Sequence, residues 1–401
     1  MKGNAITKID VRSLFSGLLP LFVLAHFAHH LLTALPIPLL PMIRSDFGLD
    51  YTRSGLVISA FILAYGIGQV PAGWLSDRVG PRILIAIGIV GVALAGLLVG
   101  LSNTYIVMIA FLVLMGVLAG GYHPAAPPLI STTVEPRSLG RALGFHMIGG
   151  SASFFLSPLI AAGIATAWGW RGSFVTLAVP TAVFGITLYV LLGRRLPTRE
   201  IQPTTAPADV AETSPQGGSR SLACFIFLST FTHAVAYSII SFIPLYLVDH
   251  FGIEKETAAA LVALIYSAGL WAGPLGGHFS DRLGRVPVVV VVCLMSGPLI
   301  YLLNLAPYRW GVYTLFLIIG MTIYVRMPVS EAYIVGRTSE RRRSSVLGIY
   351  FFGNMEGGGL LTPVMGYLID HFGFYAGFTV AGAVVLAVTL VCAAFLWRSH
   401  Q

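Results

Sequence analysis

The chain has 401 residues, of which 56% are hydrophobic and only 10% are charged, and its formal net charge is +8. Soluble globular domains carry about 25% charged residues, so this composition excludes an ordinary soluble domain and indicates a polytopic membrane protein. The basic excess does not predict nucleic-acid binding, because 18 of the 24 Lys and Arg residues fall in alternate loops on one side of the expected topology. That side also holds both termini, so the positive-inside rule predicts that the termini are cytoplasmic.

Twelve apolar runs, each near the ~20 residues that a membrane span needs, follow one another along the chain. Six of them lie at 14–40, 54–75, 83–101, 105–131, 142–166 and 171–193, with a polar turn at 44–48 after the first. Residues 194–221 are rich in Pro, Thr, Ser and Gly and predict a cytoplasmic linker. Six more runs lie at 222–247, 257–280, 286–304, 310–335, 344–369 and 374–397. We therefore predict an all-α membrane protein with six-helix bundles at 1–193 and 222–401, joined by the linker.

An internal repeat relates the two halves at one ungapped offset of 204 residues. The offset pairs apolar, polar and charged positions alike: Phe27 with Phe231, His29 with His233, Asp77-Arg78 with Asp281-Arg282, Pro124 with Pro328, Arg137 with Arg341, and Gly169 with Gly373. A chance match between apolar sequences would not keep charges, histidines and prolines in register. The repeat predicts two parallel, pseudo-symmetric bundles.

Two short charged turns between apolar runs share one spacing of glycines and charges. The first contains Gly73, Asp77, Arg78, Gly80 and Arg82, and the second contains Gly277, Asp281, Arg282, Gly284 and Arg285. The second glycine of each turn allows a tight reversal of the backbone. The Asp and Arg side chains are suited to bridging adjacent helix ends, and breaking such a bridge would accompany a conformational change.

This spacing resembles the loops between helices 2 and 3 and between helices 8 and 9 of the major facilitator superfamily. The resemblance covers nearly the whole chain. It implies a secondary transporter of a small molecule in the inner (cytoplasmic) membrane, working by alternating access as a monomer in the lipid bilayer, without a cofactor. An enzyme is not expected, because the sequence has no nucleophile–base set, phosphate-binding loop or metal set.

Charged residues inside apolar runs cost a few kcal/mol each and are functional candidates by default. Arg326 lies about ten residues, or ~15 Å, from the cytoplasmic end of its predicted helix. Glu356 lies near the middle of the next helix, and Glu331 lies beyond Arg326 on a different face. One interpretation is a salt bridge from Arg326 to either acid that only joins helices. The other is that Arg326 binds an anionic substrate while Glu356 or Glu331 exchanges a proton.

The amino-terminal half has histidines in place of a buried acid. His26, His29 and His30 share one face of the first helix, and His123 precedes Pro124 in the fourth. We expect His26, His29, Tyr122, His123 and, in the other half, His233 to contribute to substrate binding. His30 and His146 are expected to form hydrogen bonds between helices. No acid or thiol joins the histidines in sequence, so no metal site is expected.

A narrower resemblance rests on three segments: Ala25-His26-Phe27-Ala28-His29-His30-Leu31-Leu32, Gly121-Tyr122-His123-Pro124 and Ile148-Gly149-Gly150-Ser151. They look like the fosmidomycin-resistance branch of bacterial exporters, although Tyr122 stands for a Phe, and Thr33 and Ala125 stand where an acid is expected. The resemblance implies proton-driven export of a small anionic or amphiphilic compound. Proton-coupled uptake of an organic acid such as a monocarboxylate is the alternative, and a membrane sensor or scaffold without transport is a third hypothesis.

Overall fold

The computed structural model describes residues 17–135, 138–196 and 219–398, and the regular structure in these ranges is helical. Most of the predicted linker, the first sixteen residues and Arg137 of the repeat lie outside the described residues. The first half contains α2 (Leu19–Thr33), α3 (Leu40–Phe47), α4 (Tyr51–Val79), α5 (Pro81–Ala86), a π-helical segment (Ile87–Gly91), α6 (Val92–Gly100), α7 (Tyr105–Ala119), α8 (Tyr122–Ser131) and α9 (Leu139–Arg195). The second half contains α10 (Ser219–Phe251), α11 (Lys255–Ser267), a 3-10 turn (Ala268–Leu270), α12 (Ala272–Leu283), α13 (Arg285–Leu302), α14 (Trp310–Arg337) and α15 (Glu340–Arg398).

The described helices make this a multi-pass membrane protein. Eight are long and apolar enough to cross a bilayer, or nine if the bent pair Lys255–Leu270 and Ala272–Leu283 forms one span. The helices α9 and α15 have 57 and 59 residues, about twice the length of a span. Each is kinked at a glycine outside helical geometry, Gly169 in α9 and Gly373 in α15, between two of the predicted runs.

The first helix differs from the sequence prediction of one run at 14–40 and a polar turn at 44–48. Helix α2 ends at Thr33, and a chain of turns through Pro36 and Pro38 leads into α3. Proline has no backbone N–H to donate and clashes with the preceding turn, so the two prolines stop the helix early. The predicted polar turn is instead the last turn of α3, and only Gly48, with φ of 61°, has left-handed geometry.

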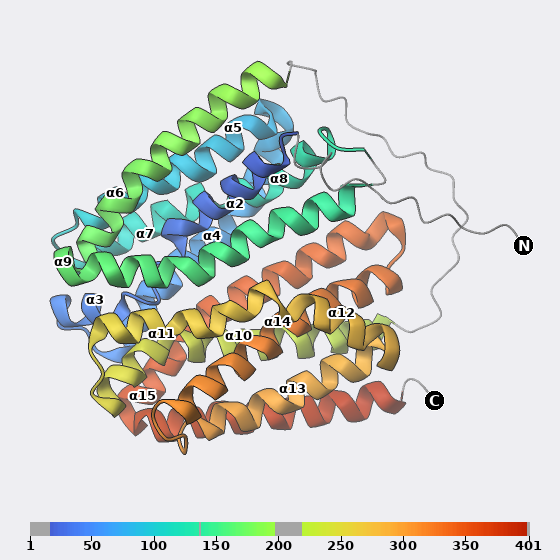
Figure 1. Ribbon diagram of the computed structural model, residues 1–401. Helices are drawn as coiled ribbons and strands as arrows, with labels where there is room; N and C mark the ends of the chain where they lie inside the picture. The colour runs from blue at the N-terminus through green and yellow to red at the C-terminus, as the bar shows by residue number, and fades with distance from the viewer. Residues whose placement is uncertain (1–16, 136–137, 197–218, 399–401) are drawn as a thin grey trace, which may run out of the picture.

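The internal repeat extends to the backbone conformation. Six glycines in the described chain have positive φ, and they form three pairs separated by 204 residues: Gly48 with Gly252, Gly80 with Gly284, and Gly169 with Gly373. Side chains larger than hydrogen are disfavoured in this region, so glycine is required at the same points of both halves. In Figure 1 the helices α2–α9, in blue to green, lie beside α10–α15, in yellow to red.

The two halves are joined at the end away from the described termini. The side chains of Arg44 in α3 and Asp249 in α10 form an ion pair, and the Tyr51 hydroxyl donates to the same carboxylate at 2.6 Å. Asp370 of α15 accepts hydrogen bonds from the backbone N–H groups of Tyr51 and Thr52 at 2.9 and 2.8 Å. Asp370 therefore caps the N-terminus of α4 across the interface, where a negative charge is favourable. We call this the closed end.

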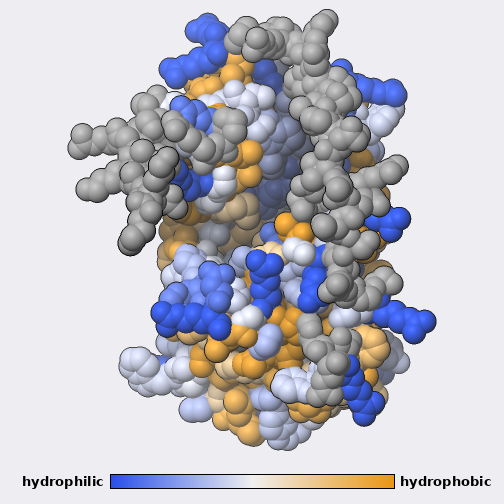
Figure 2. Space-filling model, turned by 90° about the vertical axis from the view of Figure 1, so that its right-hand side faces the viewer, coloured by the Kyte–Doolittle hydropathy of each residue, from blue (hydrophilic) through white to orange (hydrophobic). Residues whose placement is uncertain are grey.

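The halves separate toward the other end, where the described chain begins and finishes (Figure 1). Gln69 of α4 donates a hydrogen bond to the Met355 sulfur of α15 at 3.1 Å. Immediately beyond this contact Val70 is 71% exposed, and Phe352, almost one turn from Met355, is 52% exposed. Figure 2 views the molecule from this end, on which hydrophilic side chains gather. The structure is therefore closed at one end and open at the other.

Candidate functional site

The two charged turns lie at the open end. Gly80 and Gly284 have φ of 90° and 89° and begin α5 and α13, as the predicted tight reversals require. Arg82 donates from Nε to the Tyr189 carbonyl at 2.9 Å and stacks on the Tyr189 ring. Arg285 donates to the Ala332 carbonyl at 2.7 Å. The two arginines thus attach the first turns of α5 and α13 to neighbouring helices of their own halves.

The Asp-Arg pairs of these turns are exposed. Arg78 lies over the ring of Trp74 at 3.6 Å, and Asp77, Asp281 and Arg282 are exposed. Among the described residues, none of these four charged groups forms an ion pair with another helix end in this open arrangement. Gly73 has only ordinary packing space toward Pro124, and Gly277 faces open space, so neither glycine makes a close helix contact here.

Arg326 is the largest fully buried side chain of the described residues, at 2% exposure on α14. Its Nη1 donates to both the carbonyl and the hydroxyl oxygen of Ser229 on α10, each at 2.6 Å. Its Nη2 is buried without a hydrogen-bond partner. In the described part of the chain, neither Glu356 nor Glu331 forms a salt bridge with Arg326. The guanidinium is therefore held in place by Ser229, with one nitrogen unpaired and no counterion.

Other unsatisfied polar groups belong to the same half. His233, one turn after Ser229, is near enough to Arg326 to experience its charge, and its Nδ1 is buried and unpartnered. Glu331 also lies within electrostatic range of Arg326. The Oδ1 atom of Asn354 on α15 is likewise buried without a partner. Buried polar groups normally have hydrogen-bond partners, so this concentration of exceptions indicates a ligand site.

Glu356 lies in the interface between the halves. Its side chain is 6% exposed, and its Oε1 has no hydrogen-bond partner. Its carboxylate packs directly against Gly66 of α4, and any side chain at position 66 would overlap the carboxylate. The carboxylate of Glu356, on α15, therefore lies in the contact between α15 and α4.

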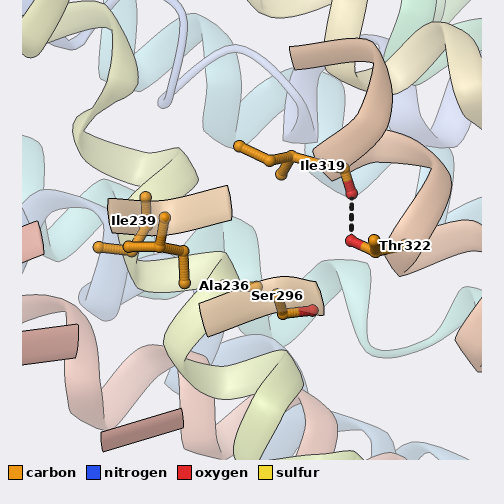
Figure 3. Close-up of a pocket in the computed structure, with 6 residues that line it drawn as sticks. Ala236, Ile239, Ser296, Ile319 and Thr322 are labelled. Carbon is orange, nitrogen blue, oxygen red and sulfur yellow. Dashed lines mark hydrogen bonds between the residues drawn. The ribbon is translucent and has the colours of Figure 1, made fainter. Parts of the chain in front are cut away.

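A small pocket lies among α10, α13 and α14, next to these groups (Figure 3). Its lining includes Thr322, one turn before Arg326, and Ala236, one turn after His233. The Thr322 hydroxyl donates to the Ile319 carbonyl at 2.7 Å. The pocket has room for about one water molecule, so it is a packing gap beside the site and not a substrate cavity.

The histidines of the first half gather where α2, α8 and α9 meet. His26 donates from Nδ1 to the His146 carbonyl at 2.9 Å, and His146 Nδ1 donates to the Phe22 carbonyl at 3.1 Å. Gly149 and Gly150 permit this close approach, because a Cβ atom at Gly150 would lie 2.6 Å from the His26 ring. The predicted role of His146 as a link between helices agrees with this geometry.

His29 has partners on both ring nitrogens. Its Nδ1 donates to the carbonyl of Gly88 at 2.9 Å, and its Nε2 is 3.3 Å from the Tyr65 hydroxyl. Gly88 lies in the π-helical segment, where the backbone hydrogen-bond pattern is irregular and leaves the Gly88 carbonyl accessible to a side chain. Tyr122 stacks on His29 with ring centroids 4.4 Å apart, and its hydroxyl is buried without a partner.

The structure gathers His26, His29 and His30 of α2 around His123 of α8, and the ring of His29 lies 5.4 Å from that of His123. The rings of His26 and His30 lie 5.3 and 5.4 Å from that of His123. Sequence analysis also missed Ser229 and Asn354. Both are polar residues in apolar runs. Ser229 also precedes His233 by one helical turn, and this spacing could have indicated that the two side chains share a site.

A sequence profile of the Major Facilitator Superfamily matches the chain twice, over residues 22–225 and 222–401. The chain belongs to the Major Facilitator Superfamily. It is 25% identical over 379 residues to a hexuronate transporter of Bacillus subtilis (strain 168), covering 89% of this chain and 88% of that protein. It is 27% identical over 365 residues to the multidrug resistance protein MdtG of Salmonella typhimurium (strain LT2), covering 88% and 89%. These superfamily relatives are transporters and not enzymes, as the sequence predicted.

Solved structures agree with the superfamily fold. A bacterial homolog of the human lysosomal transporter Spinster, in an inward-facing and occupied conformation, matches with a TM-score of 0.76 at 17% identity, covering 96% of both chains. At this identity the match bears on the fold alone.

Proposed function

We propose that this protein transports a small organic anion by alternating access, with the anionic group bound at Arg326. One observation carries the proposal: a fully buried guanidinium that lacks a carboxylate partner and has an unbonded Nη2. An uncompensated buried charge is costly, and a planar guanidinium is suited to a carboxylate or phosphate. A substrate anion supplies the missing counterion.

The surrounding residues support this assignment. His233, Asn354 and Tyr122 offer unpartnered polar atoms for the rest of the solute. The similarity to a transporter of hexuronates, which are sugar carboxylates, favours a hydroxylated organic acid. His26, His29 and His123 form the proposed wall of the site in the first half. The charged turns, which include Asp77 and Asp281, act as the switch between conformations.

Proton coupling is proposed to act through Glu356 or Glu331. Glu356 lies between α4 and α15, so its charge state acts on the interface that must open. Export in exchange for protons requires substrate and proton to compete, and it is the direction favoured by the similarity to MdtG. Uptake with protons requires that protonation of the acid favour anion binding, because linkage is reciprocal. The separate positions of Arg326 and Glu356 favour this second candidate, since both sites can be filled at once.

The topology that goes with this function has twelve spans and cytoplasmic termini in an inner membrane. Helices α9 and α15 each supply two spans across their glycine kinks, and α11 with α12 supplies one. Helix α2, continued by the proline-rich turns, is the first span. The basic turns at the open end then face the cytoplasm, and the transporter acts as a monomer.

Counterflow in proteoliposomes tests the function. Vesicles preloaded with a panel of organic acids, including D-glucuronate, are assayed for uptake of the labelled compound, with and without a proton gradient. D-glucose is the matched neutral control. We expect exchange of an acid and none of the neutral sugar. Equal exchange of both compounds, or activity toward neutral and cationic drugs alone, would refute anion binding at Arg326. No exchange with any compound would favour a sensor or scaffold.

A further inference from the structure

Three imidazoles from two helices converge in the first half. His26 and His30 are on α2, and His123 is in the first turn of α8. A ring nitrogen of each lies within 4.8 Å of a ring nitrogen of the other two. His26 and His30 are buried, and His123 is partly exposed.

Hydrogen bonding fixes the tautomer of His26. Its Nδ1 faces the backbone carbonyl of His146 at 2.9 Å, and a carbonyl only accepts, so Nδ1 carries the proton. The Nε2 atom of a neutral imidazole is then a lone-pair acceptor. This Nε2 is buried and has no hydrogen-bond partner, and His26 is only 1% exposed. His26 therefore presents an unsatisfied lone pair.

The contacts of Thr33 favour the same tautomer of His30. Its Nδ1 lies 3.1 Å from the Thr33 hydroxyl. That hydroxyl has one hydrogen, which is directed to the carbonyls of His29 and His30 at 3.4 Å. With that hydrogen used, Thr33 is free to accept from His30 Nδ1, an arrangement that leaves the lone pair on the Nε2 of His30.

We propose that His26, His30 and His123 bind one divalent transition-metal ion, with Zn²⁺ as the best fit. Lone pairs gathered in a buried site repel one another unless they share a cation, and neutral imidazole suits Zn²⁺, Ni²⁺ and Cu²⁺. A histidine ligand characteristically donates its other ring N–H to a carbonyl or another oxygen, as His26 and His30 do here. Tetrahedral Zn²⁺ with Zn–N of about 2.0–2.1 Å needs donor atoms roughly 3.4 Å apart. A shift of about an ångström closes the trio from its present spacing.

Three histidine ligands would leave a fourth coordination position for a further ligand. His123 is the partly exposed member of the trio. The ring of Phe154 packs on His30 at 4.6 Å and also contacts Tyr266 of α11, in the other half, at 5.4 Å. Three protein ligands with an open position are typical of zinc sites that bind a further ligand. Sequence analysis did not predict a metal site, because no acid or thiol joins these histidines; only the fold shows how close His123 of α8 lies to His26 and His30.

Cobalt binding to the purified full-length protein tests the site without a transport assay. The protein is prepared with a tag that lacks histidine, stripped with a chelator and titrated with Co²⁺, whose visible absorption reports four-coordinate binding. Zn²⁺ is then added as competitor. We expect one Co²⁺ per chain, displaced by Zn²⁺. His26→Gln, His30→Gln and His123→Gln should each weaken binding at least 100-fold.

Two further variants separate ligation from loss of fold. Thr33→Val is nearly isosteric and removes only the oxygen that orients His30, so it should weaken binding about 10- to 100-fold. His371→Gln removes an exposed histidine of α15 and should leave binding unchanged. Absence of saturable Co²⁺ binding in the wild type would overturn the proposal. So would binding that survives all four substitutions at the site, including Thr33→Val, which does not depend on losing a ring.

Discussion

Removing the Arg326 side chain tests the central claim about the substrate site. Arg326→Ala deletes the buried guanidinium whose Nη1 is bonded to Ser229 and whose Nη2 is unpaired. Truncating one partner of a buried, hydrogen-bonded charge pair costs roughly 2–5 kcal/mol. At about 1.4 kcal/mol per tenfold, a loss near 3 kcal/mol raises the Kd of an anionic substrate by about 100-fold.

Two milder variants give the expected order of effects. Arg326→Lys keeps the charge but replaces the planar fork with a point charge, so it should restore binding only in part. Ser229→Ala removes one of the two oxygens that hold Nη1 and leaves the carbonyl. Losing a hydrogen bond to a charged group costs about 1.5 kcal/mol, which corresponds to roughly a tenfold weaker Kd.

The assay is equilibrium binding of the acid identified by counterflow, measured by calorimetry on protein of verified size and melting temperature. Arg398→Ala, at an exposed arginine near the end of α15, is the matched control and should bind normally. Folded Arg326→Ala with wild-type affinity for the anion would refute the reasoning. Arg326→Ala that fails to fold, while Arg326→Lys folds and binds normally, would mean that the arginine only supports the helix packing.

Three other predictions follow from the interface and the turns. Glu356→Gln should make substrate affinity independent of pH. In the wild type, affinity that rises on acidification would support uptake with protons, and affinity that falls would support export by exchange. A flat wild-type profile would show that no proton is coupled to transport. Asp370→Ala removes the carboxylate that accepts from the Tyr51 and Thr52 N–H groups across the interface, while Asp50 still caps α4. It should weaken the closed end by about 1 kcal/mol and raise the accessibility of a cysteine probe there several-fold, whereas Asp370→Asn should change it less. Equal labelling of wild type and Asp370→Ala would count against this gate. Asp77→Asn or Arg78→Ala should reduce the transport turnover, while expression and substrate affinity stay normal. Asp281→Asn should reduce turnover less. Full transport by the first two variants would show that the first turn is not the conformational switch.

The sequence determined the features that depend on composition and on neighbours along the chain. Low charge and long apolar runs specify membrane-spanning helices, because a bilayer accepts little else. The offset of 204 residues predicted equivalent backbone geometry in the two halves, since only glycine adopts positive φ without strain, and Gly80 with Gly284 has it. Arg326 and Glu356 stood out for the same local reason, as charges in apolar surroundings.

The tertiary structure alone decided which polar atoms meet. Helical periodicity put His26, His29 and His30 on one face, but the partners of each ring depend on the rotation and approach of other helices. Gly88, in its π-helical segment, satisfies His29, while His123 approaches His26 and His30 from α8. Sequence analysis therefore named His26, His29 and His123 as candidates, but it could not show that the ring nitrogens of His29 are already bonded to Gly88 and Tyr65. The same limit hid Ser229 as the residue that holds Arg326, because its 2.6 Å contacts join helices 97 residues apart in the chain, and no local pattern encodes that distance.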